Sequence, residues 1–214
     1  MSSFTYDVVY PEGSRNRLTV AFRLIWAIPH LIIADVWGSL ANILGFVQWF
    51  IILFTGKRNE GIWKLQQSYV YYYCRVGGYV ALQFDEYPAF GTDGPPAPVR
   101  SEILFEESAD RLTSALRIIW VIPALIIAIF VGIAAEVVVL ISWFSIVITG
   151  KQSRGMWDFV LKFLRFVFQV QTYLLLMTDT YPKFGEGAPA ASMSSAPPPP
   201  PSSFVPPPPP APAG

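Results

Sequence analysis

The chain contains an internal duplication, and this feature constrains its fold more than any other. Residues 17–91 align without a gap with residues 111–185, at a constant offset of 94 positions. Both copies open with Arg-Leu-Thr and close with Tyr-Pro-x-Phe-Gly. A repeat of this length indicates two copies of one supersecondary unit that fold in the same way.

The duplication divides the chain into five segments. They are a polar lead-in (1–16), a first membrane repeat (17–91), a polar linker (92–110), a second membrane repeat (111–185) and a proline-rich tail (186–214). The lead-in lacks the apolar core of a cleavable signal peptide, so the first hydrophobic run is expected to act as its own insertion signal.

Each repeat contains a long apolar run, Leu24–Phe54 and Ile118–Ile148, which is long enough to cross a membrane. Charged residues make up only 14% of the chain and hydrophobic residues 53%, whereas soluble proteins contain about 25% charged residues. The sequence therefore predicts an all-α integral membrane protein of the bacterial cytoplasmic membrane. We expect multiple passes, and two tandem repeats that run parallel because the linker between them is short and polar.

Two topologies remain open for each repeat. The apolar run could cross once as a long helix, with the following aromatic helix crossing back. Alternatively, the run could fold into a hairpin near Asp35–Gly38, with the aromatic helix on the membrane surface. The length of the run favours the first arrangement, and the hairpin would gather the basic residues on one side of the membrane.

The aromatic helix of each repeat is predicted to be amphipathic. In the second repeat its polar residues recur at intervals of four and three, which places them on one helical face: Asp158, Lys162, Arg165, Gln169 and Thr172. Such a helix could lie in the membrane interface or span the membrane with its polar stripe against another helix. A short extended lead-in precedes each repeat.

The repeats contain a set of short motifs: Arg17-Leu18-Thr19, Arg23, Ile28-Pro29-His30-Leu31, Trp49-Phe50, Thr55-Gly56, Tyr87-Pro88 and, in the second copy, Thr178-Asp179-x-Tyr181-Pro182. In these motifs the chain resembles a bacterial, largely actinobacterial, membrane family catalogued as domain-of-unknown-function family 4389, present here as two tandem copies. The second copy departs from the pattern at Ala124, where the family pattern has histidine. The resemblance implies a multi-pass membrane protein and no particular activity.

Basic residues near the ends of the apolar runs are the first candidate site. Side chains of this kind extend to lipid phosphates or fix the topology: Arg17, Arg23, Lys57, Arg111, Arg117 and Lys151. The Thr-Gly-Lys sequences at 55–57 and 149–151 lack the spacing of a phosphate-binding loop. They are interpreted as helix ends with a glycine cap.

Two carboxylates inside the apolar runs, Asp35 and Glu136, are the second candidate site, because acids within a membrane are costly and are often functional. The single histidine, His30, and the single cysteine, Cys74, cannot build a metal site or an intramolecular disulfide. No nucleophile–base arrangement is evident in the sequence. We therefore expect no enzyme activity, no catalytic residue, no cofactor and no metal.

The net charge is zero, which argues against nucleic acid as a partner. The expected partners are the lipid bilayer, another membrane protein, or a proline-binding protein that recognises the two five-proline runs of the tail. The tail itself is predicted to be disordered and prone to the polyproline II conformation. The leading hypothesis is a non-enzymatic scaffold, accessory or membrane-shaping protein, and the alternative is a small transporter or channel component.

Overall fold

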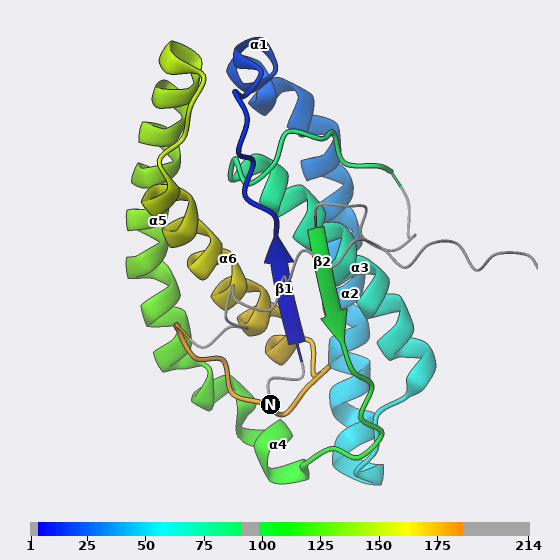
Figure 1. Ribbon diagram of the computed structural model, residues 1–214. Helices are drawn as coiled ribbons and strands as arrows, with labels where there is room; N and C mark the ends of the chain where they lie inside the picture. The colour runs from blue at the N-terminus through cyan, green and yellow to red at the C-terminus, as the bar shows by residue number, and fades with distance from the viewer. Residues whose placement is uncertain (1–3, 91–98, 186–214) are drawn as a thin grey trace, which may run out of the picture.

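The computed structural model describes residues 4–90 and 99–185 of the chain. The predicted disordered tail (186–214) and the start of the linker (92–98) lie outside the described residues. In chain order the elements are β1 (Phe4–Val8), α1 (Arg17–Ala21), α2 (Arg23–Thr55), α3 (Glu60–Val80), β2 (Val99–Ile103), α4 (Arg111–Trp120), α5 (Ile122–Thr149) and α6 (Arg154–Leu174) (Figure 1). The predicted mostly helical fold is therefore confirmed.

The long apolar runs form continuous helices. Helix α2 has 33 residues and α5 has 28. Neither turns back on itself, so the predicted alternative of a hairpin near Asp35–Gly38 is wrong. That segment contains no proline, and Gly38 packs against the ring of Tyr69 rather than opening into a turn. Pro29 is accommodated inside α2.

Both long helices end at a glycine in the left-handed conformation, with φ of 72° at Gly56 and 74° at Gly150. Glycine adopts this conformation without steric cost and commonly ends helices. The interpretation of the two Thr-Gly-Lys sequences as capped helix ends is confirmed. A sharp turn at each glycine sends α3 back along α2 and α6 back along α5 (Figure 1).

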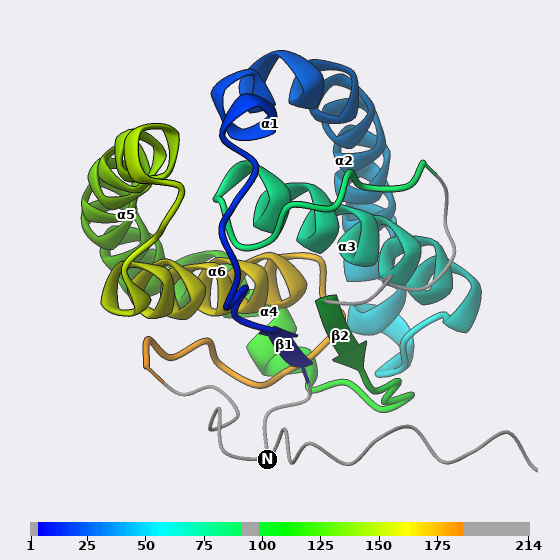
Figure 2. The ribbon, with the colours of Figure 1, turned by 45° about the horizontal axis from the view of Figure 1, so that its top comes forward.

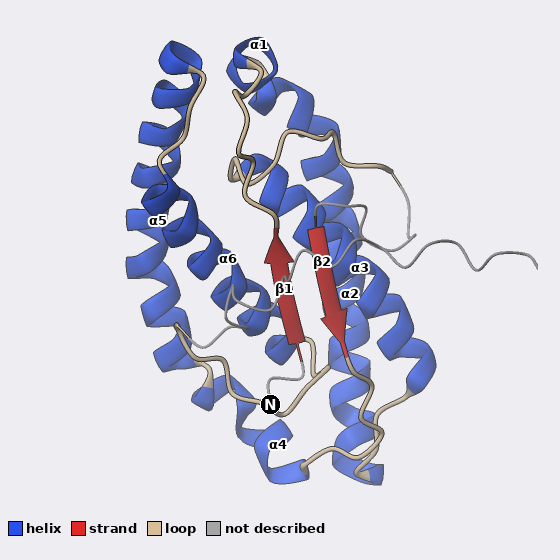
Figure 3. Cartoon of the chain, in the orientation of Figure 1, coloured by secondary structure: helices blue, strands red, loops and turns tan. Residues whose placement is uncertain are grey.

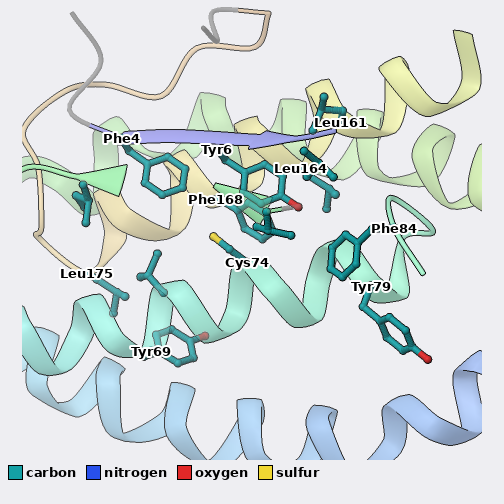
Figure 4. Packing of buried hydrophobic residues seen from close by; sticks show 14 of the residues in the cluster. Phe4, Tyr6, Tyr69, Cys74, Tyr79, Phe84, Leu161, Leu164, Phe168 and Leu175 are labelled. Carbon is teal, nitrogen blue, oxygen red and sulfur yellow. The ribbon is translucent and has the colours of Figure 1, made fainter. Parts of the chain in front are cut away.

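The two lead-in segments pair with each other as strands. Strands β1 and β2 are antiparallel, with Phe4 opposite Ile103 and Val8 opposite Val99. Alternate residues of both strands are buried, as expected for strands with one face on the core. Figure 4 shows Phe4 and Tyr6 above α3 and α6, where the Tyr6 and Phe168 rings meet edge to face with their centroids 4.8 Å apart.

The close approach of β1 to α3 requires a glycine. A Cβ atom at Gly78 would lie 2.4 Å from the hydroxyl oxygen of Tyr6 and 2.8 Å from the Phe84 ring. Any larger residue at this position would displace the Tyr6 and Phe84 side chains from this packing. The strand layer, α3 and α6 therefore share one hydrophobic core, which also contains Cys74 (Figure 4).

The two repeats run antiparallel, so the prediction of parallel repeats is wrong. The indole nitrogen of Trp49, near the end of α2, donates to the carbonyl of Ser114 at 2.9 Å. Its equivalent Trp143, near the end of α5, donates to the carbonyl of Val20 at 3.0 Å. Each long helix thus ends beside the start of the other repeat. These reciprocal contacts, together with the antiparallel strand pair, relate the repeats by an approximate twofold rotation.

The elements form three layers. Helices α2 and α5 lie on the outside, α3 and α6 form the middle layer, and the two strands cover the opposite side (Figure 2). Figure 3 shows the strands beside the middle of the long helices rather than beyond their ends. The polar stripe of α6 faces the strands, because Arg165 donates to the carbonyl of Tyr6 and to Asp7. Arg165 therefore contacts a strand, whereas the sequence predicts contact with another helix or with the membrane interface.

Candidate functional site

The outer surfaces of α2 and α5 are apolar. In α2 mainly small residues face the interior, including Ala27, Ala34, Gly38, Ala41 and Gly45, so the large side chains point outward. We call the exposed large residues the outer apolar face; they include Leu24, Ile28, Ile32, Val36, Leu40, Ile43, Phe46, Phe50 and Phe54 in α2, and Ile126, Ile129, Phe130, Ile133, Val137, Leu140, Ile141, Phe144 and Ile148 in α5. Both helices are long and apolar enough to cross a membrane. Soluble monomers rarely expose apolar patches of this extent.

The strand side of the molecule is polar. Arg100 and Glu102 of β2 are exposed, and Asp7 of β1 pairs with Arg165 of α6 at 2.7 Å. The molecule therefore has an apolar side and a charged side, separated by α3 and α6 (Figure 2).

A buried cluster around Asp85 joins the first repeat to the lead-in. Arg23 at the start of α2 donates to Asp85 at 2.6 Å and to the carbonyls of Tyr79 and Phe84. Its guanidinium also lies over the Tyr79 ring, 4.5 Å from the centroid. Arg15 binds both oxygens of Asp85. The carboxylate thus neutralises two cations, both almost fully buried.

A matching cluster surrounds Asp179 in the second repeat. Arg117 donates to Asp179 at 2.6 Å and to the carbonyls of Tyr173 and Thr178, and lies over the Tyr173 ring. The second cation is Arg58, whose side chain is fully buried and which pairs with Asp179 at 2.6 Å. The two clusters occupy equivalent positions in the two repeats.

The two arginines of the first cluster lower the pKa of its aspartate. Burial alone would raise the pKa of Asp85, but the hydrogen bonds and positive charge of Arg15, followed by the charge and hydrogen bond of Arg23, outweigh it. The pKa of Asp85 is therefore held below its ordinary value. The carboxylate stays ionised at neutral pH and binds the two arginines.

These clusters correct the interpretation of Arg23 and Arg117 as lipid-headgroup or topology residues. Each is at most 3% exposed and binds a carboxylate and two carbonyls of its own repeat. A guanidinium enclosed by protein in this way cannot reach a lipid phosphate. The physical reason is that a buried guanidinium needs acceptors for its N–H groups, and the aspartate and the carbonyls at and beyond the ends of α3 and α6 supply them.

The other four basic candidates remain exposed and gather at the two ends of the molecule. The Arg17 side chain lies beside Gly150, next to Lys151, and the Arg111 side chain lies beside Gly56. Lys57 forms an exposed ion pair with Glu107 at 2.8 Å. The C-terminus of each long helix therefore lies beside an arginine of the other repeat. The positive charge interacts favourably with the free carbonyl groups at the end of the helix.

The structure does not bring the two carboxylates of the apolar runs together. Asp35 of α2 and Glu136 of α5 are both exposed, and the two helices are spaced apart (Figure 1). His30 is buried instead, with its Nδ1 atom 2.8 Å from the Tyr72 hydroxyl and its ring stacked on Phe90. Within the described part of the chain, His30 is a packed and hydrogen-bonded core residue.

The comparison with known families decides the classification. The family model described as a domain of unknown function, DUF4389, matches residues 17–91 and again residues 111–185. The chain belongs to the DUF4389 family. No curated protein and no solved structure matches it.

The geometry assigns a structural role to much of the DUF4389 pattern. The arginine after Arg-Leu-Thr and the aspartate before Tyr-Pro meet in each repeat, as Arg23 with Asp85 and Arg117 with Asp179. Sequence reasoning did not single out the two aspartates, Arg15 or Arg58. The recurrence of an arginine and an aspartate at the two ends of both DUF4389 copies was the signal that could have paired them.

No metal centre is formed by the described residues of this DUF4389 protein, which contain no group of three or more histidine, cysteine, aspartate and glutamate side chains. Burial raises the pKa of the Cys74 thiol well above its ordinary value. Cys74 is therefore a packed thiol rather than an activated nucleophile.

Proposed function

We propose that this DUF4389 protein is a non-enzymatic membrane scaffold that inserts the outer apolar face of α2 and α5 into one leaflet of the bilayer. A single observation carries the proposal: the apolar helices cover one side of the molecule, and the charged strands cover the other (Figure 2). An amphipathic slab of this kind gains free energy by lying flat at a membrane surface, where each side meets its preferred solvent.

The position of the strands favours this arrangement over the multi-pass one that the sequence suggests. If α2 and α5 crossed the bilayer, the strands beside their midpoints would lie at the centre of the membrane (Figure 3). Arg100 and Glu102 would then be exposed to lipid. A charged residue at that depth costs about 2.5–3.5 kcal/mol even by insertion measurements.

Lying flat also suits a membrane-shaping role. Two long apolar helices in one leaflet add area to that leaflet alone, which favours curvature. The transporter alternative has weaker support, because its two candidate acids, Asp35 and Glu136, are exposed and lie on different helices. An ion path needs polar groups that line a shared interior.

Cysteine accessibility tests the orientation. Single cysteines replace Lys57, Lys151 and Arg100 in a Cys74→Ala background, and an impermeant maleimide is added to intact cells and to inside-out vesicles. Lys57 and Lys151 follow the ends of antiparallel helices. The flat arrangement therefore predicts that all three sites react from the same side, whereas a spanning arrangement places Lys57 and Lys151 on opposite sides.

A matched control comes from the outer apolar face. Val137→Cys lies on α5 and is 52% exposed in the protein alone. We expect it to resist the maleimide from both sides of the membrane and to react after detergent is added. Reaction of Val137→Cys in intact membranes would contradict insertion of this face.

A further inference from the structure

A groove lies where the second repeat meets the start and end of the first. Its volume is about 430 Å³, within the range of about 300–1,000 Å³ that is typical of ligand sites. The walls are formed mainly by apolar side chains of α3, α5 and α6, including Val80, Ala81, Val139, Leu140, Trp143 and Phe163. Arg23 also lines the groove, but its guanidinium is bound to Asp85 and to two carbonyls.

Two positions beside this groove differ between the repeats. The position equivalent to Ala81 is Leu175, which is 1% exposed. Leu175 packs against Gly45 of α2, where an added Cβ would lie 3.7 Å from its Cδ2 atom. The equivalent of Gly45 in the groove is Val139. Leucine exceeds alanine by the same number of carbon atoms as valine exceeds glycine, so the two exchanges compensate in size. In the groove the bulk comes from Val139 of α5, and the position beside it is the small Ala81.

The groove contains one charged group without a partner. Glu136 of α5 lines it and is exposed. Among residues 4–90 and 99–185, no cation forms an ion pair with Glu136. Its carboxylate favours a positively charged group at the groove and disfavours an anion. An apolar space of this size with a single acid fits an amphiphile that has a hydrocarbon chain and a cationic group.

We propose that the groove binds one acyl chain of a phospholipid whose head group carries an ammonium, with the ammonium near Glu136. The acyl chain would lie against the apolar walls of the groove, beside Ala81 and Leu140. This inference rests on the proposed function, because the groove lies along α5, whose outer face is taken to meet lipid. Apolar cavities accept apolar occupants readily because water gains few hydrogen bonds there.

Native mass spectrometry of the full chain, released from detergent micelles doped with phosphatidylethanolamine, tests the proposal. We expect one retained lipid per wild-type chain. Ala81→Leu copies the residue of the other half and fills the groove, so the retained lipid should fall at least about tenfold, which corresponds to roughly 1.4 kcal/mol of binding free energy. Ala134→Leu makes the same change at an exposed position of α5 outside the groove and should retain the lipid.

Two further variants keep the test decisive. Leu140→Trp alters a groove residue that is 57% exposed, so it obstructs the groove without repacking the core and should also lose the lipid. Glu136→Gln should keep the acyl chain but lose the preference for phosphatidylethanolamine over phosphatidylglycerol. Absence of a retained lipid on the wild type, or equal retention by Ala81→Leu and Ala134→Leu, would overturn the proposal.

Vesicle flotation separates this inference from the proposed function. Wild type, Ala81→Leu and Ala134→Leu should all float with phospholipid vesicles if the outer apolar face inserts. Flotation without a retained lipid would refute the groove site alone. Failure of the wild type to float would refute the membrane insertion on which the groove site depends.

Discussion

The two repeats bury the same arginine–aspartate pair, but each takes its second arginine from a different segment. In the first repeat the second cation is Arg15, from the lead-in before α1, and in the second it is Arg58, from the loop after α2. The residue equivalent to Arg15 is Ala109, and the residue equivalent to Arg58 is Gln152. Gln152 still takes part, because its side-chain oxygen accepts from Arg15 at 2.7 Å.

This difference shows that each cluster is shared between the repeats. The loop of the second repeat reaches the Asp85 cluster through Gln152, and the loop of the first repeat reaches the Asp179 cluster through Arg58. Backbone hydrogen bonds also join the two repeats. The backbone N–H of Arg15 donates to the carbonyl of Gly150, and that of Ala109 donates to the carbonyl of Gly56. The clusters therefore hold the two repeats together as well as closing each one.

The largest effect should come from removing either carboxylate. Asp85→Asn or Asp179→Asn leaves two buried arginines without a counter-charge, and breaking a buried pair in this way costs about 3–5 kcal/mol. We expect the two variants to lose similar free energies of unfolding, measured by denaturant titration in detergent. Glu86→Gln, an exposed neighbour of Asp85, is the control and should be near neutral. A large loss in only one of the two aspartate variants would show that the clusters are not equivalent.

Much of the architecture could be predicted from the sequence, because its signals are local. The duplication gave two copies of one unit, the apolar runs gave α2 and α5, and the glycines after them gave the helix ends. The direction of one repeat relative to the other could not be predicted. It depends on the pairing of β1 with β2, which is a contact between segments nearly a hundred residues apart.

The arginines show the same limit in the candidate sites. A basic residue beside an apolar run is equally compatible with a lipid phosphate and with a buried carboxylate, and the choice depends on where the chain returns. For Arg23 and Arg117 the chain returns with Asp85 and Asp179. Within residues 4–90 and 99–185, Arg17 and Arg111 form no ion pair with an acid, and they stay exposed at the ends of the molecule.

A smaller effect should appear in acid and concerns the Asp85 cluster. Because the folded-state pKa of Asp85 lies below its ordinary value of 3.8, its charge contributes stability that is fully present above that value. This stability is lost as the pH falls through the folded-state pKa. We expect the free energy of unfolding to decline below about pH 4. Asp85→Asn should remove this part of the decline, whereas Asp179→Asn should retain it. An unchanged acid profile in Asp85→Asn would contradict the assignment.

The smallest effect concerns a second difference between the repeats, the contact of His30 with Tyr72. Their equivalents are Ala124 and Phe166, so the second repeat lacks both polar groups. Tyr72→Phe copies the second repeat at one position and leaves the buried Nδ1 atom of His30 without its partner at 2.8 Å. The loss of one buried hydrogen bond should cost about 1 kcal/mol.

The matched control for this variant is Tyr73→Phe. Tyr73 follows Tyr72 on α3, and its ring packs against Phe168 and Tyr69. Its hydroxyl has no hydrogen-bond partner in the described part of the chain, so removing it should change the free energy of unfolding by less than Tyr72→Phe does. Adding His30→Ala to Tyr72→Phe completes the change to the second repeat's residues and removes the stranded imidazole. If Tyr72→Phe and Tyr73→Phe proved equally stable, the His30 contact would contribute packing alone, and the two repeats would differ less in energy than in sequence.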